Sequence, residues 1–218
     1  MKRNSIGNDI VALNTINAEK NLQPRFYSKF LSLPETGLYN NKFPIPFEQF
    51  IWACWSIKES VFKFQKRIQP EVVFSFRNIN IQLVQVPQHD PVFNFSEGVA
   101  EYNCLPNQNC YNSVTAIGSS SFYSHSYVSD DFIYTITVDE AAQKNIFWGI
   151  KFIKDTSPYT QSKSIREFVL QKLHGVSGET DLDILKSEVG YPYVNKHQHI
   201  PVSFTHHHNF IGYSFLAD

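Results

Sequence analysis

Apolar positions in the chain follow two different periods. Between Pro46 and Lys66 they recur every three or four residues, which is the spacing of one helical face. Pro46 suits a first helical turn, and the basic end of this segment suits a helix C-terminus. A shorter helix is predicted at Pro24–Leu33, stopped near Pro34. Ser5–Leu13, by contrast, has the β-branched composition of a strand.

The remainder of the chain consists mainly of short strand-like runs separated by Pro, Asn, Asp and Ser turns. Strands are predicted at Val72–Phe76, Ile79–Val86, Val99–Cys104, Ser113–Ile117, Phe132–Val138, Asn145–Ile153, Asp181–Lys186, Tyr191–Asn195, Pro201–Thr205 and Phe210–Leu216, with a helix at Ser162–Leu173. The order strand, helix and antiparallel strands thus occurs twice. It predicts an α+β fold of two similar halves, residues 1–143 and 144–218, that meet near Glu140–Lys144.

Composition and charge restrict the class of protein. The chain has 218 residues, of which 42% are hydrophobic and 18% charged, as in ordinary globular proteins. Its net charge of -1 argues against a nucleic-acid or anionic-membrane binder. No run of about 18 apolar residues and no signal peptide is evident. Cys54, Cys104 and Cys110 form no C-x-x-C pair, so reduced cysteines in a cytoplasmic protein are expected.

The long predicted helix carries one polar stripe. Trp55, Glu59 and Lys63 are spaced four residues apart and share a face, with Lys58 beside them. Spacing alone favours a surface Glu–Lys pair worth a few tenths of a kcal/mol. Asp9 changes this interpretation, because an acid in an apolar strand is rare without a partner or a cation. Asp9 and Glu59 together could hold Mg²⁺, which is commonly bound by one or two carboxylates.

Three motifs carry a family resemblance. Gly7-Asn8-Asp9, followed by Trp55-Ser-Ile-Lys58-Glu59-Ser60-Val-Phe-Lys63, resembles the signature of the 4′-phosphopantetheinyl transferase superfamily. Ser203-Phe-Thr205-His206, preceded by Gly190-Tyr-Pro192, resembles its Ser-x-Ser-His element and the Gly-x-Pro turn before it. Val11 stands where longer members often carry a second acid, as in the small holo-acyl-carrier-protein synthases, so a water is expected to replace that ligand. Thr205 stands where Ser is commoner.

The resemblance implies an activity and assigns roles to residues. The phosphopantetheine of coenzyme A is transferred to a carrier-protein serine, and adenosine 3′,5′-bisphosphate leaves. Asp9 and Glu59 hold Mg²⁺, and Glu59, directly or through a metal-bound water, is the candidate base. Lys63 offsets charge on the leaving phosphate, while Lys58 is either a second phosphate contact or a structural ion-pair partner. Ser203 and His206 contact coenzyme A in a site between the two halves.

The resemblance also implies a partner, an acidic, helical apo acyl or peptidyl carrier protein. Arg25 and Lys29 could meet it, although a solvated face explains them equally well. A monomer is expected, because two halves lie in one chain. Tyr123-Ser124-His125 is a rival to His206 as the histidine that contacts coenzyme A; strand context favours His206.

Two other functions stay open at this point. One is a metal-binding or hydrolase domain built from the late histidines His197, His199, His206, His207 and His208. Adjacent strand residues point to opposite faces, so His206 and His207 cannot bind one ion without a turn. The other is a catalytically silent module that docks carrier proteins or coenzyme A, against which Asp9, Glu59 and Lys63 argue.

Overall fold

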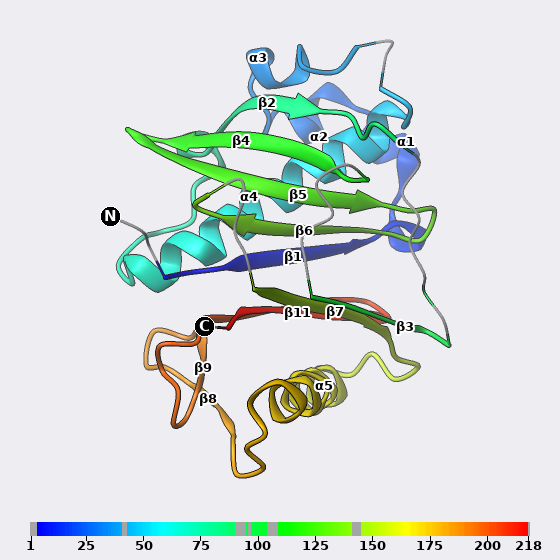
Figure 1. The fold of residues 1–218 in the computed structure, drawn as a ribbon. Helices are drawn as coiled ribbons and strands as arrows, with labels where there is room; N and C mark the ends of the chain where they lie inside the picture. Colours follow the sequence, from blue (N-terminus) through cyan, green and yellow to red (C-terminus); the bar gives the residue numbers. More distant parts are fainter. Residues whose placement is uncertain are drawn as a thin grey trace.

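A computed structural model describes residues 4–40, 43–89, 95, 97–103, 109–140 and 145–217. One antiparallel sheet is formed by the N-terminal part of the chain (Figure 1). Its strands, in spatial order, are β1 (Gly7–Ala12), β6 (Phe132–Val138), β5 (Ser120–Val128), β4 (Tyr111–Ile117) and β2 (Asn80–Gln85). The long helix α4 (Phe47–Ile68) packs along β1, β6 and β5, as the apolar periodicity predicts.

A second antiparallel sheet is formed mainly by the C-terminal part. Its strands, in spatial order, are β10 (Val202–His207), β11 (Phe210–Leu216), β7 (Ile146–Phe152) and β3 (Val99–Tyr102). Helix α5 (Pro158–Ser177) packs against it, and β8 (Ile184–Lys186) pairs with β9 (Pro192–Val194). A bridge from Tyr193 to Pro201 links this pair to the start of β10. Strand β3 comes from the N-terminal part but pairs with β7, so the N-terminal half contributes one strand to the second sheet.

The two halves share their strand order. The first strand of each half, β1 or β7, lies beside the last one, β6 or β11, which lies beside the penultimate one, β5 or β10. The chain therefore has the α+β fold with antiparallel sheets that is consistent with a phosphopantetheinyl transferase. Superposition of the halves, which would establish a pseudo-dimer, stays a prediction. The junction at residues 141–144 lies outside the described residues.

The sheets face each other, and α5 covers the outer side of the second (Figure 1). The core between them is rich in aromatic rings. Trp148 of β7 stacks on Tyr134 of β6 with ring centroids 5.5 Å apart, and both side chains are 0% exposed. The Tyr134 hydroxyl donates to the Tyr213 carbonyl at 2.7 Å. The Tyr134 side chain thus links the two sheets, because its ring packs in the core while its hydroxyl forms a hydrogen bond with the opposite sheet.

Two sequence predictions need correction, and one strand was missed. The predicted helix Pro24–Leu33 is interrupted: α2 spans Pro24–Tyr27, and Pro34 lies inside α3 (Leu33–Thr36) rather than stopping a helix. Val72–Phe76 is not a strand, since 72–75 form a loop and η2 (Phe76–Asn78) follows. Strand β5 was not predicted at all. The shortest remaining elements are η1 (Leu13–Thr15) and α1 (Ala18–Asn21). Within the described ranges, no helix is long and apolar enough to cross a membrane.

Candidate active site

Gly7 allows α4 to lie directly on β1. A Cβ atom at this position would lie 1.9 Å from the Ser60 carbonyl oxygen and 2.7 Å from the Phe64 nitrogen. Ser60 also fixes the helix, because its hydroxyl lies 2.6 Å from that of Thr137 on β6. Ser5 donates to the Phe64 carbonyl at 2.9 Å. These contacts set the distance between the strand that carries Asp9 and the helix that carries Glu59.

Asp9 and Lys63 meet across this junction. Lys63 Nζ donates to Asp9 Oδ1 at 2.9 Å, and the Asp9 side chain is 10% exposed against 29% for Lys63. Val11 packs against Ala53 of α4, so Asp9 and Val11 both face α4, as the alternation of side chains along a strand requires. The other carboxylate oxygen, Asp9 Oδ2, has no hydrogen-bond partner among the described residues. The fold thus brings Asp9 and Lys63, from two separate motifs, into direct contact.

Glu59 is the third member of this group. Burial raises the pKa of its carboxyl to about 7; the negative charge of Asp9 adds to the rise, and Lys63 opposes it. Glu59 therefore lies within electrostatic reach of both residues. No residue in the described ranges forms a hydrogen bond with its side chain. Two acidic side chains with unpartnered oxygens, beside one ammonium, form the centre of the candidate site.

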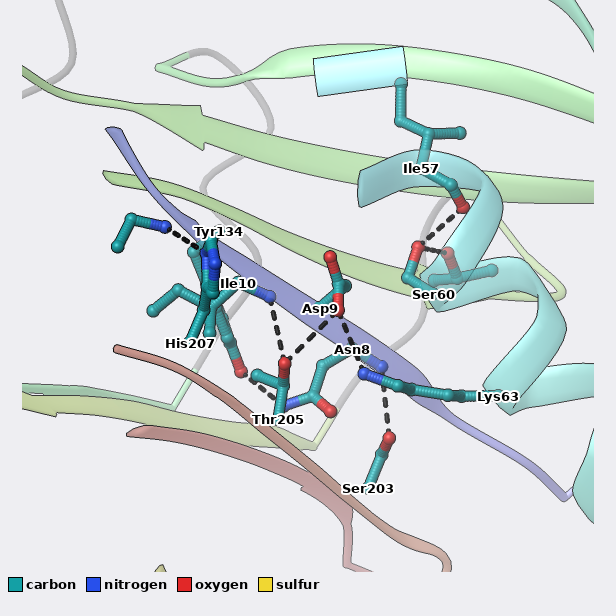
Figure 2. Close-up of polar contacts among 12 residues, drawn as sticks. Asn8, Asp9, Ile10, Ile57, Ser60, Lys63, Tyr134, Ser203, Thr205 and His207 are labelled. Carbon is teal, nitrogen blue, oxygen red and sulfur yellow. Dashed lines mark hydrogen bonds and ion pairs between the residues drawn. The ribbon is translucent and has the colours of Figure 1, made fainter. Parts of the chain in front are cut away.

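Strand β10 completes the free edge of β1 with side chains (Figure 2). The amides of Asn8, Ile10 and Ala12 donate to Ser203 Oγ at 3.1 Å, Thr205 Oγ1 at 3.0 Å and His207 Nδ1 at 2.8 Å. Alternate residues on one strand match alternate amides on the other, because both strands have a period of two. The second half of the chain thereby holds the strand that carries Asp9.

His206 and His207, adjacent on β10, have different surroundings. His207 accepts from β1, which no sequence signal beyond strand alternation suggested. The pKa of His206 is lowered by burial first and then by the nearby charge of Lys63, while Asp9 raises it. His206 therefore lies near the predicted site. The rival His125 is buried on β5, where Asn112 Oδ1 lies 2.6 Å from its Nδ1, and burial lowers its pKa to about 4.

Lys58 has a structural environment. It is 1% exposed, and its Nζ contacts Glu35 at 2.7 Å and the carbonyl oxygens of Phe30 and Phe76 at 2.8 and 3.0 Å. Glu35 also accepts from the Ile81 amide and caps α3 through Ser32. Of the two roles that the sequence left open, the contacts support the ion pair. Lys58 joins α4, α3 and β2 rather than pointing at Asp9.

A pocket of about 270 Å³ lies at the junction of α4 and the second half. Its lining includes Lys63, Ser203 and the Gly190–Pro192 turn, so three separate sequence motifs meet there. Arg67, one turn beyond Lys63, donates to the carbonyls of Pro192 and Val202 and lies over the Tyr191 ring at 4.7 Å. Arg67 thus fixes the pocket wall to α4.

Arg25 and Lys29 are exposed on and just after α2, and their contact with a partner stays a prediction. The histidine-rich alternative gains no support: His197 contacts Glu179 at 2.9 Å, and its ring is 5.4 Å from that of His199. Within the described ranges, no three His, Cys, Asp or Glu side chains are grouped to hold a metal ion. Cys54 and Cys110 are buried, and Cys104 lies outside the described residues.

Comparison with known proteins gives one family. A family model of the 4′-phosphopantetheinyl transferase superfamily matches residues 5–112, a range that contains β1 and α4. No curated protein and no solved structure matches the chain. The matched range includes Gly7, Asp9, Glu59 and Lys63, the residues that the fold brings together. The chain belongs to the 4′-phosphopantetheinyl transferase superfamily.

Proposed function

We propose that this protein transfers the 4′-phosphopantetheine group of coenzyme A to a serine of an apo acyl or peptidyl carrier protein. The serine oxygen attacks the phosphorus that carries the pantetheine arm, and the bond from that phosphorus to the bridging oxygen breaks. Adenosine 3′,5′-bisphosphate leaves with the bridging oxygen, and the serine proton passes to a base. The observation that carries the proposal is the meeting of Asp9, Glu59 and Lys63 beside a pocket built by both halves.

The acidic pair fits a hard divalent ion such as Mg²⁺. Its ligands are oxygens, and Mg²⁺ needs only one or two protein carboxylates because waters and phosphate oxygens complete its shell. Asp9 Oδ2 and the Glu59 carboxylate, both without hydrogen-bond partners among the described residues, are the atoms available to it. When bound, Mg²⁺ would neutralise charge on the pyrophosphate. Val11 supplies no ligand, so this site has fewer protein oxygens than one with a second acid on β1.

Glu59 has properties that suit a general base. Before a cation binds, a pKa of about 7 balances the ionised fraction of Glu59 against its ability to take a proton at neutral pH; bound Mg²⁺ would lower that pKa and keep the carboxylate ionised, as a base requires. Lys63, held by Asp9, would place a positive charge near the leaving phosphate. A fixed charge of this kind stabilises a transition state without reorganising when charge develops.

The neighbouring pocket supplies what coenzyme A needs. Phe62, Phe204 and Tyr191 offer apolar and aromatic surface for the adenine ring. Lys63 lines the same pocket and suits its phosphates, whereas Lys66 lines it with its Nζ already donating to the carbonyls of Pro70 and Val72. Ser203 lines it, and His206 lies close to Lys63, so both remain candidates for contacts to coenzyme A. Lys58 is not included, because its three acceptors lie in the core.

We further propose that the second substrate is an acidic carrier protein, which Arg25 and Lys29 contact. A monomeric state and a cytoplasmic location complete the proposal. The exposure of Arg25 and Lys29 is compatible with such contacts. A silent docking module with the same fold is the alternative. The unpartnered acids of the site favour catalysis over docking, because docking alone does not require them.

The test is incubation with coenzyme A, Mg²⁺ and a panel of apo carrier proteins, read by intact-mass spectrometry. We expect at least one carrier to gain a single phosphopantetheine group, and neither Asp9→Asn protein nor a reaction with a chelator to produce it. Carriers that stay unmodified across the panel, while coenzyme A still binds, would favour the silent module.

A further inference from the structure

The hydroxyl of Thr205 has two partners on β1. Its Oγ1 accepts from the Ile10 amide at 3.0 Å and lies 3.2 Å from Asp9 Oδ1. An amide N–H can only donate, so the hydroxyl proton is left for the Asp9 carboxylate, which can only accept when ionised. The direction of this hydrogen bond is therefore fixed by the backbone of β1. Thr205 is 4% exposed, so water does not compete readily for the same proton.

The neighbouring members of the same row lack this second contact. Ser203 accepts from Asn8 and His207 accepts from Ala12, and each acts on the backbone of β1. Only the Thr205 hydroxyl also reaches a side chain of the candidate metal site, among the contacts of the described residues. Satisfying the β1 edge therefore explains all three residues, but it does not account for the contact from Thr205 to Asp9.

Lys63 and Thr205 hold the same oxygen of Asp9. Figure 2 shows their two bonds converging on Oδ1, while the other carboxylate oxygen points away from both partners. Two donors on one oxygen restrict rotation of the carboxylate group. Partners of this kind orient metal ligands, and their loss typically weakens metal binding by about 10- to 100-fold.

We propose that Thr205 is a positioning residue for Asp9, whose hydroxyl fixes the carboxylate so that Oδ2 is presented to a divalent cation. The C-terminal half would then take part in the metal site through a side chain that binds no metal itself. This inference rests on the function proposed above, in which Asp9 is a ligand. It gives the threonine of the Ser-x-Thr-His element a role separate from any contact with coenzyme A.

The test measures Mn²⁺ binding to the full chain by electron paramagnetic resonance, without coenzyme A. Mn²⁺ is the probe because it takes the same oxygen ligands as Mg²⁺. We expect Thr205→Val to weaken binding about tenfold or more, and Thr205→Ser, which keeps the hydroxyl, to bind like wild type. Thr135→Val is the matched control. Thr135 is buried opposite Asp9 on β6, but its hydroxyl pairs with Ser126 at 2.9 Å.

Equal Mn²⁺ affinity in folded Thr205→Val and wild type would overturn the proposal. So would a Thr205→Ser protein that binds Mn²⁺ as weakly as Thr205→Val, or a wild type that binds no Mn²⁺. If Thr205→Val does not fold, Thr205→Cys replaces it, since a thiol is a weak donor, and the same weakening is expected. Failure of the transferase proposal would look different: no carrier would be modified, although the Mn²⁺ affinities followed the expected order.

Discussion

Replacing Lys58 by Met tests whether this motif lysine stabilises the fold. Methionine keeps the apolar stem but removes the ammonium that contacts Glu35 and two carbonyl oxygens. Loss of one partner of a buried ion pair costs about 3–5 kcal/mol. Glu35 keeps three other donors, the amide and hydroxyl of Ser32 and the amide of Ile81, which places the expected loss near the lower limit, about 3 kcal/mol.

The assay is urea unfolding followed by tryptophan fluorescence. It gives the free energy of unfolding directly. In a thermal scan, a loss of about 3 kcal/mol would appear as a melting temperature lower by about 6–12 °C for a chain of this size. Lys163→Met is the control, because Lys163 is 59% exposed and pairs with Glu167 at 3.8 Å; its cost should stay below about 0.5 kcal/mol. In a Glu35→Gln background, the Lys58→Met change should cost less than in wild type, since the charge partner is gone.

The reasoning would be refuted by a Lys58→Met protein with wild-type stability. If such a protein also transferred phosphopantetheine more slowly at saturating coenzyme A, Lys58 would be a substrate contact after all. If the Glu35→Gln background left the cost of Lys58→Met unchanged, the buried pair would not be the source of the stability.

Three further predictions concern the helix–strand contact, a buried histidine and the ammonium of the site. Gly7→Ala should cost about 3 kcal/mol or more and reduce transfer, because the added methyl overlaps the backbone of Ser60, whereas Gly175→Ala in α5, with open space around it, should raise the melting temperature slightly. The His125 imidazole stays neutral to about pH 4 when folded but takes a proton near pH 6.5 when unfolded, so the free energy of unfolding should fall as pH drops between these values. His125→Gln should flatten that slope in denaturant titrations at pH 7 and 4.5; an unchanged slope would exclude His125 as its source. Lys63→Ala should lower transfer by about 10²-fold while changing stability by less than about 1 kcal/mol, and Lys63→Arg should restore only part of it; wild-type turnover in Lys63→Ala would remove the residue from the site.

The elements with a strong period were predictable, and those held by distant partners were not. Helix α4 carries its apolar stripe in the sequence, and its predicted start at Pro46 is one residue from the observed one. Val72–Phe76 has the composition of a strand, yet Phe74 packs on Phe62 at 4.7 Å and the segment runs as a loop over α4. Strand β5 is rich in serine, and its Ser124 hydroxyl pairs with the hydroxyl of Thr137 on β6 at 2.8 Å.

The site was predictable where residue type and spacing were enough. Asp9, Glu59 and Lys63 do converge, because the motif fixes both the strand and the helix that carry them. The roles of Lys58 and Thr205 depended on contacts with residues far away in the chain. To predict the contact of Lys58, one would have to identify Glu35, which belongs to no motif. To predict the contact of Thr205, one would have to know the register between β10 and β1. Neither partner can be found from spacing within one segment.

The most direct measurement counts both products of one reaction. Wild-type protein is mixed with coenzyme A, Mg²⁺ and the best apo carrier, and modified carrier and adenosine 3′,5′-bisphosphate are quantified over time. The account predicts that they appear in a one-to-one ratio, and that Asp9→Asn stops both. Release of adenosine 3′,5′-bisphosphate without modified carrier would show hydrolysis instead, and equal rates in wild type and Asp9→Asn would contradict the proposed site.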